Sequence, residues 1–178
     1  MSKLDSSHIQ ASSEYSNNFR AAFVGMQQRK YWCAKESNEK QWIRFDFGKV
    51  HRFNKYQIQS SANGKDIVTE FKLFSSMDGK NWVTTEHVLD GSSNDVIVTN
   101  ELPVTIEGRY IKLVPLKWGK FIGLKFDLWG EEVKPSRVEM SYMKKMDESL
   151  DYKNAMDDFA KEIIDMKSAF AGDFGFVK

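Results

Sequence analysis

The sequence predicts an all-β fold, an antiparallel sandwich or jelly roll of many short strands, followed by a C-terminal α-helical extension. Segments in which apolar and polar residues alternate recur from residue 41 to residue 130. Clusters of glycine, asparagine and aspartate separate them at close intervals, which is typical of antiparallel sandwiches. After Pro135 the alternation ends and apolar residues recur at helical spacing. We therefore expect a β-sandwich over residues 1–132 and a helical extension over residues 133–178.

Composition limits the classes of protein to consider. The chain has 178 residues, of which 41% are hydrophobic and 13% aromatic, enough for a sizeable core. Its 26 Lys and Arg nearly balance 25 Asp and Glu, so no general attraction to nucleic acid is expected. No apolar run approaches the roughly 20 residues of a membrane span. The N-terminus lacks the apolar core of a signal peptide, and a single cysteine, Cys33, has no internal disulfide partner. We expect a cytoplasmic protein that is not secreted.

The N-terminal part is expected to be irregular. Residues 1–14 are polar and serine-rich, which indicates an arm rather than a core element. Residues 15–20 contain serine and asparagine, whose side chains bond to their own backbone and favour turns. Residues 21–26 form a short apolar segment.

The strongest strand signal is at residues 41–48. Ile43, Phe45 and Phe47 fall on one face at a period of two, with charged residues between them. Aromatic and β-branched residues suit a half-buried pleated surface. We expect this strand to end in a turn at Gly48.

Two further strands follow, each ending in a glycine turn. Residues 52–59 alternate again, and Asn63-Gly64 marks the turn after them. Residues 68–75 form the next strand, and Asp78-Gly79 lies at the centre of the tight turn that follows.

The last strands of the sandwich follow a polar loop. We expect residues 90–94 to be that loop and residues 96–98 to be a short strand. Pro103 should end it, because proline cannot donate a hydrogen bond to a strand ladder. Residues 108–115 and 123–130 are two more alternating strands.

The extension after Pro135 is predicted to be helical. Ser136 and Glu139 have the spacing of a helix capping box. Apolar residues at helical spacing form a candidate partner-docking surface: Tyr142, Met146, Leu150, Met156, Phe159, Ile163, Met166 and Phe170. Whether this is one helix or two, and whether it packs on its own sandwich or on a partner, stays open.

Five segments, in this order, carry a resemblance to a known family. They are YWCAKE (31–36), QWIRFDFG (41–48), FKLFSSMDGKNW (71–82), RYIKL (109–113) and LKFDLWG (124–130). The series resembles the discoidin domain, also called the type C domain of coagulation factors V and VIII, over about residues 8–131. The resemblance implies a galactose-binding-like antiparallel jelly-roll sandwich of about eight strands, and a binding module rather than an enzyme. Such modules hold glycans, phospholipid head groups or proteins, mostly with loops at one end.

The matching loops would be residues 15–20, 60–66, 90–95 and 118–120. Their polar side chains can hydrogen-bond sugar hydroxyls and their aromatic side chains can stack on a sugar ring; otherwise they are ordinary turn residues. The candidates are Asn17, Asn18, Phe19, Arg20, Asn63, Lys65, Asp66 and Trp118. Membrane-binding relatives carry apolar loop tips, whereas here the first loop offers only Phe19, so membrane affinity should be weak.

Catalytic and metal-binding patterns are missing. His8, His51 and His87 lie far apart in unlike contexts, so we expect no zinc site and no other cofactor. Some relatives hold a structural calcium ion partly through backbone carbonyls, which leave no sequence signature. Cys33 is expected to be a buried apolar side chain. Asp46 and Arg109 are expected to form a structural ion pair.

Two functions are compatible with these observations. The first is an intracellular protein-interaction or structural module that docks other proteins through the helical extension, in a larger assembly of a cytoskeletal or ciliary kind. The alternative is a module that binds a carbohydrate or a phospholipid head group with the loops at one end of the sandwich.

Overall fold

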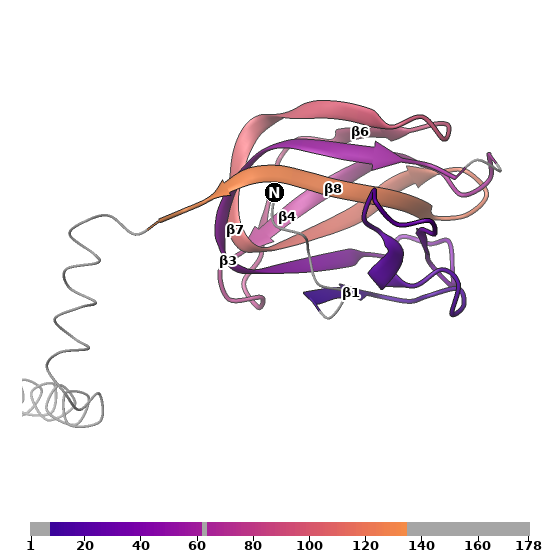
Figure 1. The fold of residues 1–178 in the computed structure, drawn as a ribbon, viewed down its shortest axis with the longest axis horizontal. Coiled ribbons are helices and arrows are strands. Elements are labelled where there is room, and N and C mark those ends of the chain that lie inside the picture. Colours follow the sequence, from indigo (N-terminus) through magenta and orange to yellow (C-terminus); the bar gives the residue numbers. More distant parts are fainter. Residues whose placement is uncertain (1–7, 62–63, 135–178) are drawn as a thin grey trace, which may run out of the picture. The chain divides into compact units, whose positions relative to one another are not determined.

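The computed structural model describes residues 8–61 and 64–134, and this part is an all-β antiparallel sandwich (Figure 1). Every pairing between its strands is antiparallel, as the alternation predicts. The elements are β1 (Ile9–Ala11), the 3-10 turn η2 (Ala21–Phe23), β2 (Trp32–Cys33), β3 (Ile43–Gln59), β4 (Val68–Ser76), β5 (Val83–Thr84), β6 (Leu89–Ser92), β7 (Val98–Trp118) and β8 (Gly123–Glu132). The predicted helical extension and its docking residues, Tyr142 to Phe170, lie outside the described residues, so both they and the boundary at residue 132 stay predictions.

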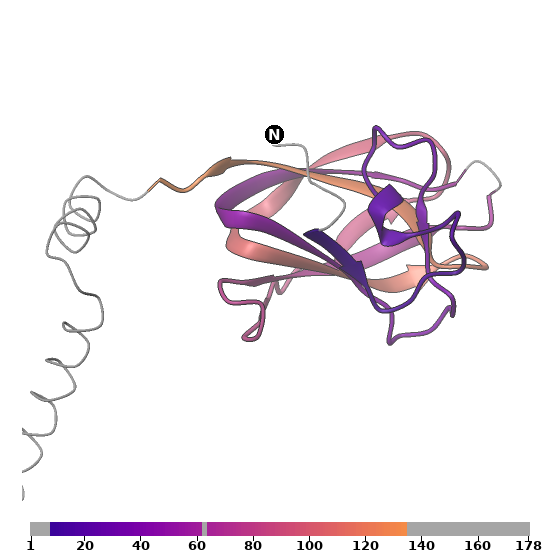
Figure 2. The same ribbon diagram turned by 60° about the horizontal axis from the view of Figure 1, so that its bottom comes forward.

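The long strands β3 and β7 belong to both layers of the sandwich (Figures 1 and 2). The first part of β3 pairs with β1 and with residues 110–113 of β7, which pairs with β4 on its other side. The second part of β3 pairs with residues 98–108 of β7 and with β8. One layer therefore contains β1, β4 and one half of each long strand. The other layer contains the remaining halves of β7 and β3, then β8, and then β2.

The core lies between these layers and is rich in aromatic rings. Tyr56 of β3, Phe71 of β4 and Phe126 of β8 are each at most 2% exposed. The ring of Phe71 meets the other two edge to face, with centroids 5.4 Å and 5.7 Å away. Each fully buried ring of this kind contributes about 1.5–3 kcal/mol through the area it removes from water. The inward positions Ile43 and Phe45 extend this core, as their alternation predicts.

The prediction that the first strand ends at Gly48 is wrong. Gly48 lies inside β3, with φ of 75°, where the register with β7 shifts between Asp46 and His51. A positive φ is easily adopted by glycine and bends the strand without ending it. The glycine signal was correct for the local conformation, but the strand passes from one layer to the other through the bend.

The prediction that Pro103 ends a strand is also wrong, because β7 continues through it. In the ladder with β3, Glu101 is opposite Lys55 and the next pair is Ile106 with Phe53. Residues 102–105 therefore have no partner in β3, and the missing N–H of the proline breaks no ladder bond.

Two shorter segments also differ from expectation. Part of the predicted arm, Ile9–Ala11, forms β1 on the edge of β3. Part of the predicted loop at residues 90–94 belongs to β6, which pairs with β4. Both are edge strands of a few residues, too short to show a period of two.

The predicted ion pair between Asp46 and Arg109 is confirmed. The Nε and one terminal nitrogen of Arg109 donate to the two carboxylate oxygens of Asp46 at 2.8 Å and 3.0 Å. These bonds hold the pKa of Asp46 below its usual value. The pair joins β7 to β3 beside the bend.

Most connecting loops gather at one end of the sandwich. Figure 2 shows the indigo loops between β1 and β3 at the end where β8 begins, away from the end where β8 leaves the sandwich. Within residues 8–61 and 64–134, no helix has the length and hydrophobicity that a membrane crossing requires.

Candidate functional site

Backbone hydrogen bonds at this end join residues 15–20 to Cys33 and residues 60–66 to Phe121, and Cys33 pairs with Gly123 at the start of β8. The N–H of Cys33 donates to the carbonyl of Phe19 at 3.2 Å, and the N–H of Tyr15 donates to the carbonyl of Cys33 at 2.9 Å. The N–H of Phe121 donates to the carbonyl of Lys65 at 3.0 Å. These bonds fix the relative positions of loops that are far apart in the sequence.

A pocket of about 170 Å³ opens between these loops, and we call it the loop-end pocket. It is lined by Tyr15, Phe19, Tyr31, Cys33, Asp66 and Phe121. Cys33 and Asp66 are only 5% and 6% exposed, whereas Tyr15 is 57% exposed. The carboxylate therefore lies at the inner end of the pocket and an aromatic ring lies at its mouth.

The aromatic side chains contact one another. The ring of Phe19 lies 5.8 Å from that of Tyr15 and 5.0 Å from that of Tyr31, both nearly edge to face. Such pairs hold the rings in fixed orientations. Phe19 is thus part of the pocket rather than a projecting apolar tip.

The polar groups of the pocket form one hydrogen-bonded unit. The Tyr31 hydroxyl donates to Oδ2 of Asp66 and also bonds to the side chain of Ser61. Burial and then the bond to Asp66 raise the pKa of Tyr31 well above its usual value, so the phenol stays protonated. Burial and then the charge of Asp66 raise the pKa of Cys33 to about 12, so its thiol is not a nucleophile at neutral pH.

A glycine allows the two polar residues to approach β8. A Cβ at Gly123 would lie 2.7 Å from the Cβ of Asp66 and 3.2 Å from a ring carbon of Tyr31. Position 123 therefore needs a residue without a side chain if Tyr31 and Asp66 are to keep their places.

Among the predicted ligand residues, Phe19 and Asp66 line the loop-end pocket. Asn17 and Asn18 are not among its lining residues. Asn17 is exposed, and Asn18 accepts a hydrogen bond from Lys30 at 2.7 Å. Arg20 lies 3.5 Å from Glu14 in an exposed ion pair.

The remaining predicted residues do not line the pocket. Lys65 is exposed beside it and contributes its carbonyl to the loop contacts. Trp118 is partly buried against the hydrophobic core. Asn63 lies outside the described residues.

The sequence prediction missed Tyr15, Tyr31 and Phe121 as lining residues. Tyr15 and Tyr31 lie at the ends of polar loops, a position typical of aromatic residues that anchor a loop. Phe121 follows the Trp118-Gly-Lys segment that the resemblance had indicated. An isolated aromatic residue in a polar loop is the signal that was available.

Metal ligands are not gathered in the described part of the chain. No group of three or more His, Cys, Asp or Glu side chains is close enough there to hold an ion. The loop-end pocket combines aromatic faces with one carboxylate and one phenol.

The fold is an all-β antiparallel sandwich with a pocket between the loops at one end. Residues 8–128 match the model of the F5/8 type C domain. The chain belongs to the F5/8 type C domain family, as the resemblance implied. Neuropilin-1a of Danio rerio is 27% identical over 140 residues, 72% of this chain and 15% of the relative. The chain thus spans a small fraction of that curated relative.

Solved structures show the same fold. Discoidin II of Dictyostelium discoideum has a TM-score of 0.63 at 20% identity, over 71% of this chain and 55% of that one. The module CpGH89CBM32-5 of Clostridium perfringens, in complex with GalNAc-β-1,3-galactose, has a TM-score of 0.60 at 21% identity, over 72% and 99%. The family 32 CBM of C. perfringens NanJ, in complex with galactose, has a TM-score of 0.58 at 13% identity, over 70% and 96%.

Proposed function

We propose that this chain is a non-catalytic carbohydrate-binding module and that it holds a single sugar residue in the loop-end pocket. The observation that carries the proposal is the lining of that pocket, in which aromatic rings surround a buried carboxylate and a partly buried phenol. Sugars present apolar C–H faces and hydroxyl edges. Aromatic rings can stack on the C–H faces, and Asp66 and Tyr31 can hydrogen-bond to the hydroxyl groups.

The ligand class is supported by the neighbouring structures. Two modules with this fold were solved with galactose and with GalNAc-β-1,3-galactose bound. Galactose and N-acetylgalactosamine are therefore the first sugars to test on this chain.

Binding without catalysis is supported by the number of acids. Hydrolysis of a glycosidic bond usually needs two carboxyl groups on either side of it. Among the residues that line the loop-end pocket, Asp66 is the single carboxylate. The thiol of Cys33 is protonated and does not replace the second group.

The protein-interaction function predicted first has less support. Its docking residues lie outside the described part of the chain, and neither the fold nor the comparisons favour a cytoskeletal or ciliary assembly. The phospholipid alternative is weakened because Phe19 packs between Tyr15 and Tyr31 rather than extending into solvent.

The test is titration of the full chain with galactose, N-acetylgalactosamine and GalNAc-β-1,3-galactose. Binding is measured by NMR and by calorimetry. We expect Tyr15→Ala to weaken binding about tenfold, because a stacking ring at the mouth is lost. Asp66→Asn should also weaken it, because one acceptor oxygen is replaced by an NH2 donor. The matched control is Val83→Ala, which removes a 69% exposed side chain far from the pocket and should bind normally.

Two results would reject the proposal. One is the absence of binding to these sugars and to a broad glycan array. The other is binding that Tyr15→Ala and Asp66→Asn leave unchanged. Pelleting with vesicles of phosphatidylserine and phosphatidylcholine, without sugar binding, would assign the pocket to a lipid head group instead.

A further inference from the structure

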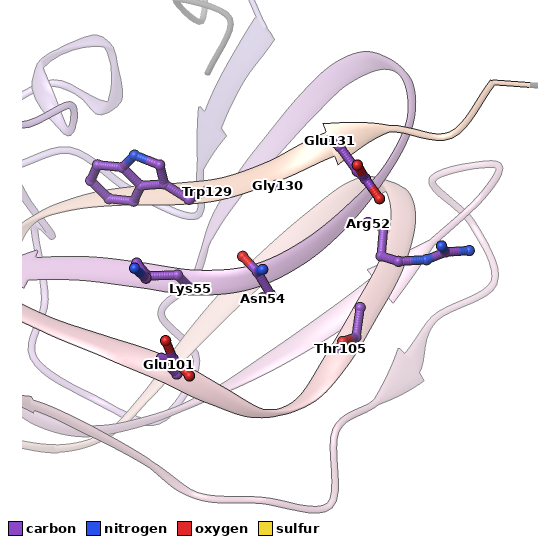
Figure 3. Close-up of a pocket in the computed structure, with 8 residues that line it drawn as sticks. All are labelled: Arg52, Asn54, Lys55, Glu101, Thr105, Trp129, Gly130 and Glu131. Atoms are coloured by element: carbon purple, nitrogen blue, oxygen red, sulfur yellow. The ribbon is translucent and has the colours of Figure 1, made fainter.

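A second hollow lies away from the loops, on the outer face of the layer made by β8, β3 and β7. Its volume is about 470 Å³, against about 170 Å³ for the loop-end pocket. We call it the strand groove. Figure 3 shows the residues that line it: Arg52, Asn54, Lys55, Glu101, Thr105, Trp129, Gly130 and Glu131.

The groove forms where the strands are irregular. The register of β3 shifts between Phe53 and Lys55 on both of its sides, so Asn54 has no opposite residue in β7 or β8. Residues 102–105 of β7 have no partner in β3 or β4. On the β8 side the backbones are close, since a Cβ at Gly130 would lie 2.2 Å from the carbonyl oxygen of Arg52. The sheet is therefore open on one side of β3 and closed on the other.

Most polar side chains around the groove, though not Arg52, lack partners among the described residues. Lys55 lies directly opposite Glu101, yet the two form no ion pair. On the same two strands Arg52 lies opposite Glu107 and does form one, at 3.0 Å. Three more side chains at the groove make no hydrogen bond or ion pair with described residues: Asn54, Thr105 and Glu131.

Trp129 supplies a flat apolar surface beside these polar groups. It lies opposite Lys55 in the pairing of β8 with β3, and Figure 3 shows both side chains on the same face. Its indole N–H donates to no described residue, whereas that of Trp32 donates to the carbonyl of Ser13 at 3.0 Å. Trp129 is also not among the residues packed against the hydrophobic core.

The charges around the groove balance. Two cations, Arg52 and Lys55, stand with two anions, Glu101 and Glu131. A polyanion or a polycation would meet as many like charges as opposite ones. A neutral ligand with many hydroxyl groups meets donors and acceptors throughout and can lay one ring on Trp129. The volume of the groove is in the range of small-molecule sites.

We propose that the strand groove is a second binding site, for a neutral oligosaccharide stacked on Trp129 and hydrogen-bonded by Lys55 and Glu101. It uses no residue of the loop-end pocket, so it stands or fails independently of the proposed function. Its greater volume fits several sugar residues of one chain, whereas the loop-end pocket fits one.

The test uses the full chain and three neutral tetrasaccharides: galactotetraose, cellotetraose and tetra-N-acetylchitotetraose. The readout is the indole N–H signal of Trp129 in NMR spectra, assigned with Trp129→Phe. We expect at least one tetrasaccharide to shift this signal. Trp129→Ala should weaken that binding about tenfold, and Trp129→Phe should retain part of it.

Control variants separate the groove from the loops and from general damage. Tyr15→Ala should leave the shift of the Trp129 signal intact, because Tyr15 lines the other pocket. Trp82→Ala removes a half-buried tryptophan that lies under Lys112, outside the groove, and should bind normally. Lys55→Gln and Glu101→Gln should weaken binding and keep the melting temperature, because these side chains have no described partner to lose.

Three outcomes would overturn the proposal. The first is a Trp129 signal that none of the tetrasaccharides moves. The second is binding that Trp129→Ala leaves unchanged. The third is efficient cross-linking of Lys55 to residues 135–178 within the free monomer, which would show that the chain itself covers the groove.

Discussion

The substitution Gly123→Ala tests whether β8 holds the loop-end pocket in shape. The added Cβ would lie 2.7 Å from the Cβ of Asp66, and ordinary contact begins near 3.4 Å, so the two must separate by about 0.7 Å. It would also press on the ring of Tyr31 at 3.2 Å. Overpacking of this kind costs about 1–3 kcal/mol. The lower entropy of the unfolded alanine chain returns less than about 1 kcal/mol of this.

We therefore expect Gly123→Ala to lower the melting temperature by about 4–8 °C and to weaken sugar binding at the loop-end pocket. The assay is thermal unfolding followed by circular dichroism, beside titration with galactose. Gly25→Ala is the matched control, because the nearest atoms to its Cβ would be those at the flexible end of Gln27, 3.2 Å away. It should melt within about 2 °C of the wild type. If Gly123→Ala melts and binds like Gly25→Ala, the steric reasoning is refuted.

Three further predictions concern titratable groups. Because Arg109 lowers the pKa of Asp46, the ion pair stabilises the fold above about pH 4, and this contribution is lost at lower pH. In urea unfolding, Arg109→Gln should therefore reduce the fall in unfolding free energy below about pH 4. A fall as steep as that of the wild type would contradict this prediction. Burial raises the pKa of Asp127, so its charge destabilises the fold as pH rises above about 4. Asp127→Asn should therefore gain unfolding free energy at about pH 7 relative to about pH 4, measured against the wild type. Because burial raises the pKa of Cys33 to about 12, iodoacetamide should label it only in denaturant, and fast native labelling at about pH 8 would exclude a buried thiol.

The alternation of apolar and polar residues predicted the strands well but not their ends. Ile43 and Phe45 point inward as predicted, because period two and burial describe the same geometry. Gly48 and Pro103 were misread as ends. A positive φ or a missing N–H interrupts a ladder only where a partner strand is present, and the presence of a partner depends on the tertiary fold.

The candidate site was predictable in part. Phe19 and Asp66 were found because the resemblance pointed to their loops, and the structure brings both to one pocket. Tyr31 and Phe121 reach it only through the pairing of distant segments, which a local pattern does not contain. Trp129 occupies an outward position of a strand, where sequence alone does not distinguish a solvated side chain from a binding surface.

The strand β8 sets the distance between the two proposed sites. It begins at Gly123, against Tyr31 and Asp66, and passes Trp129 six residues later. At about 3.3 Å per residue the two positions are at most about 20 Å apart along one continuous strand. A branched glycan whose arms match this span would engage one module twice, with a gain in avidity from the raised effective concentration. A glycan too short to span both sites would occupy only one of them. One module would then bind two separate glycans and bridge them.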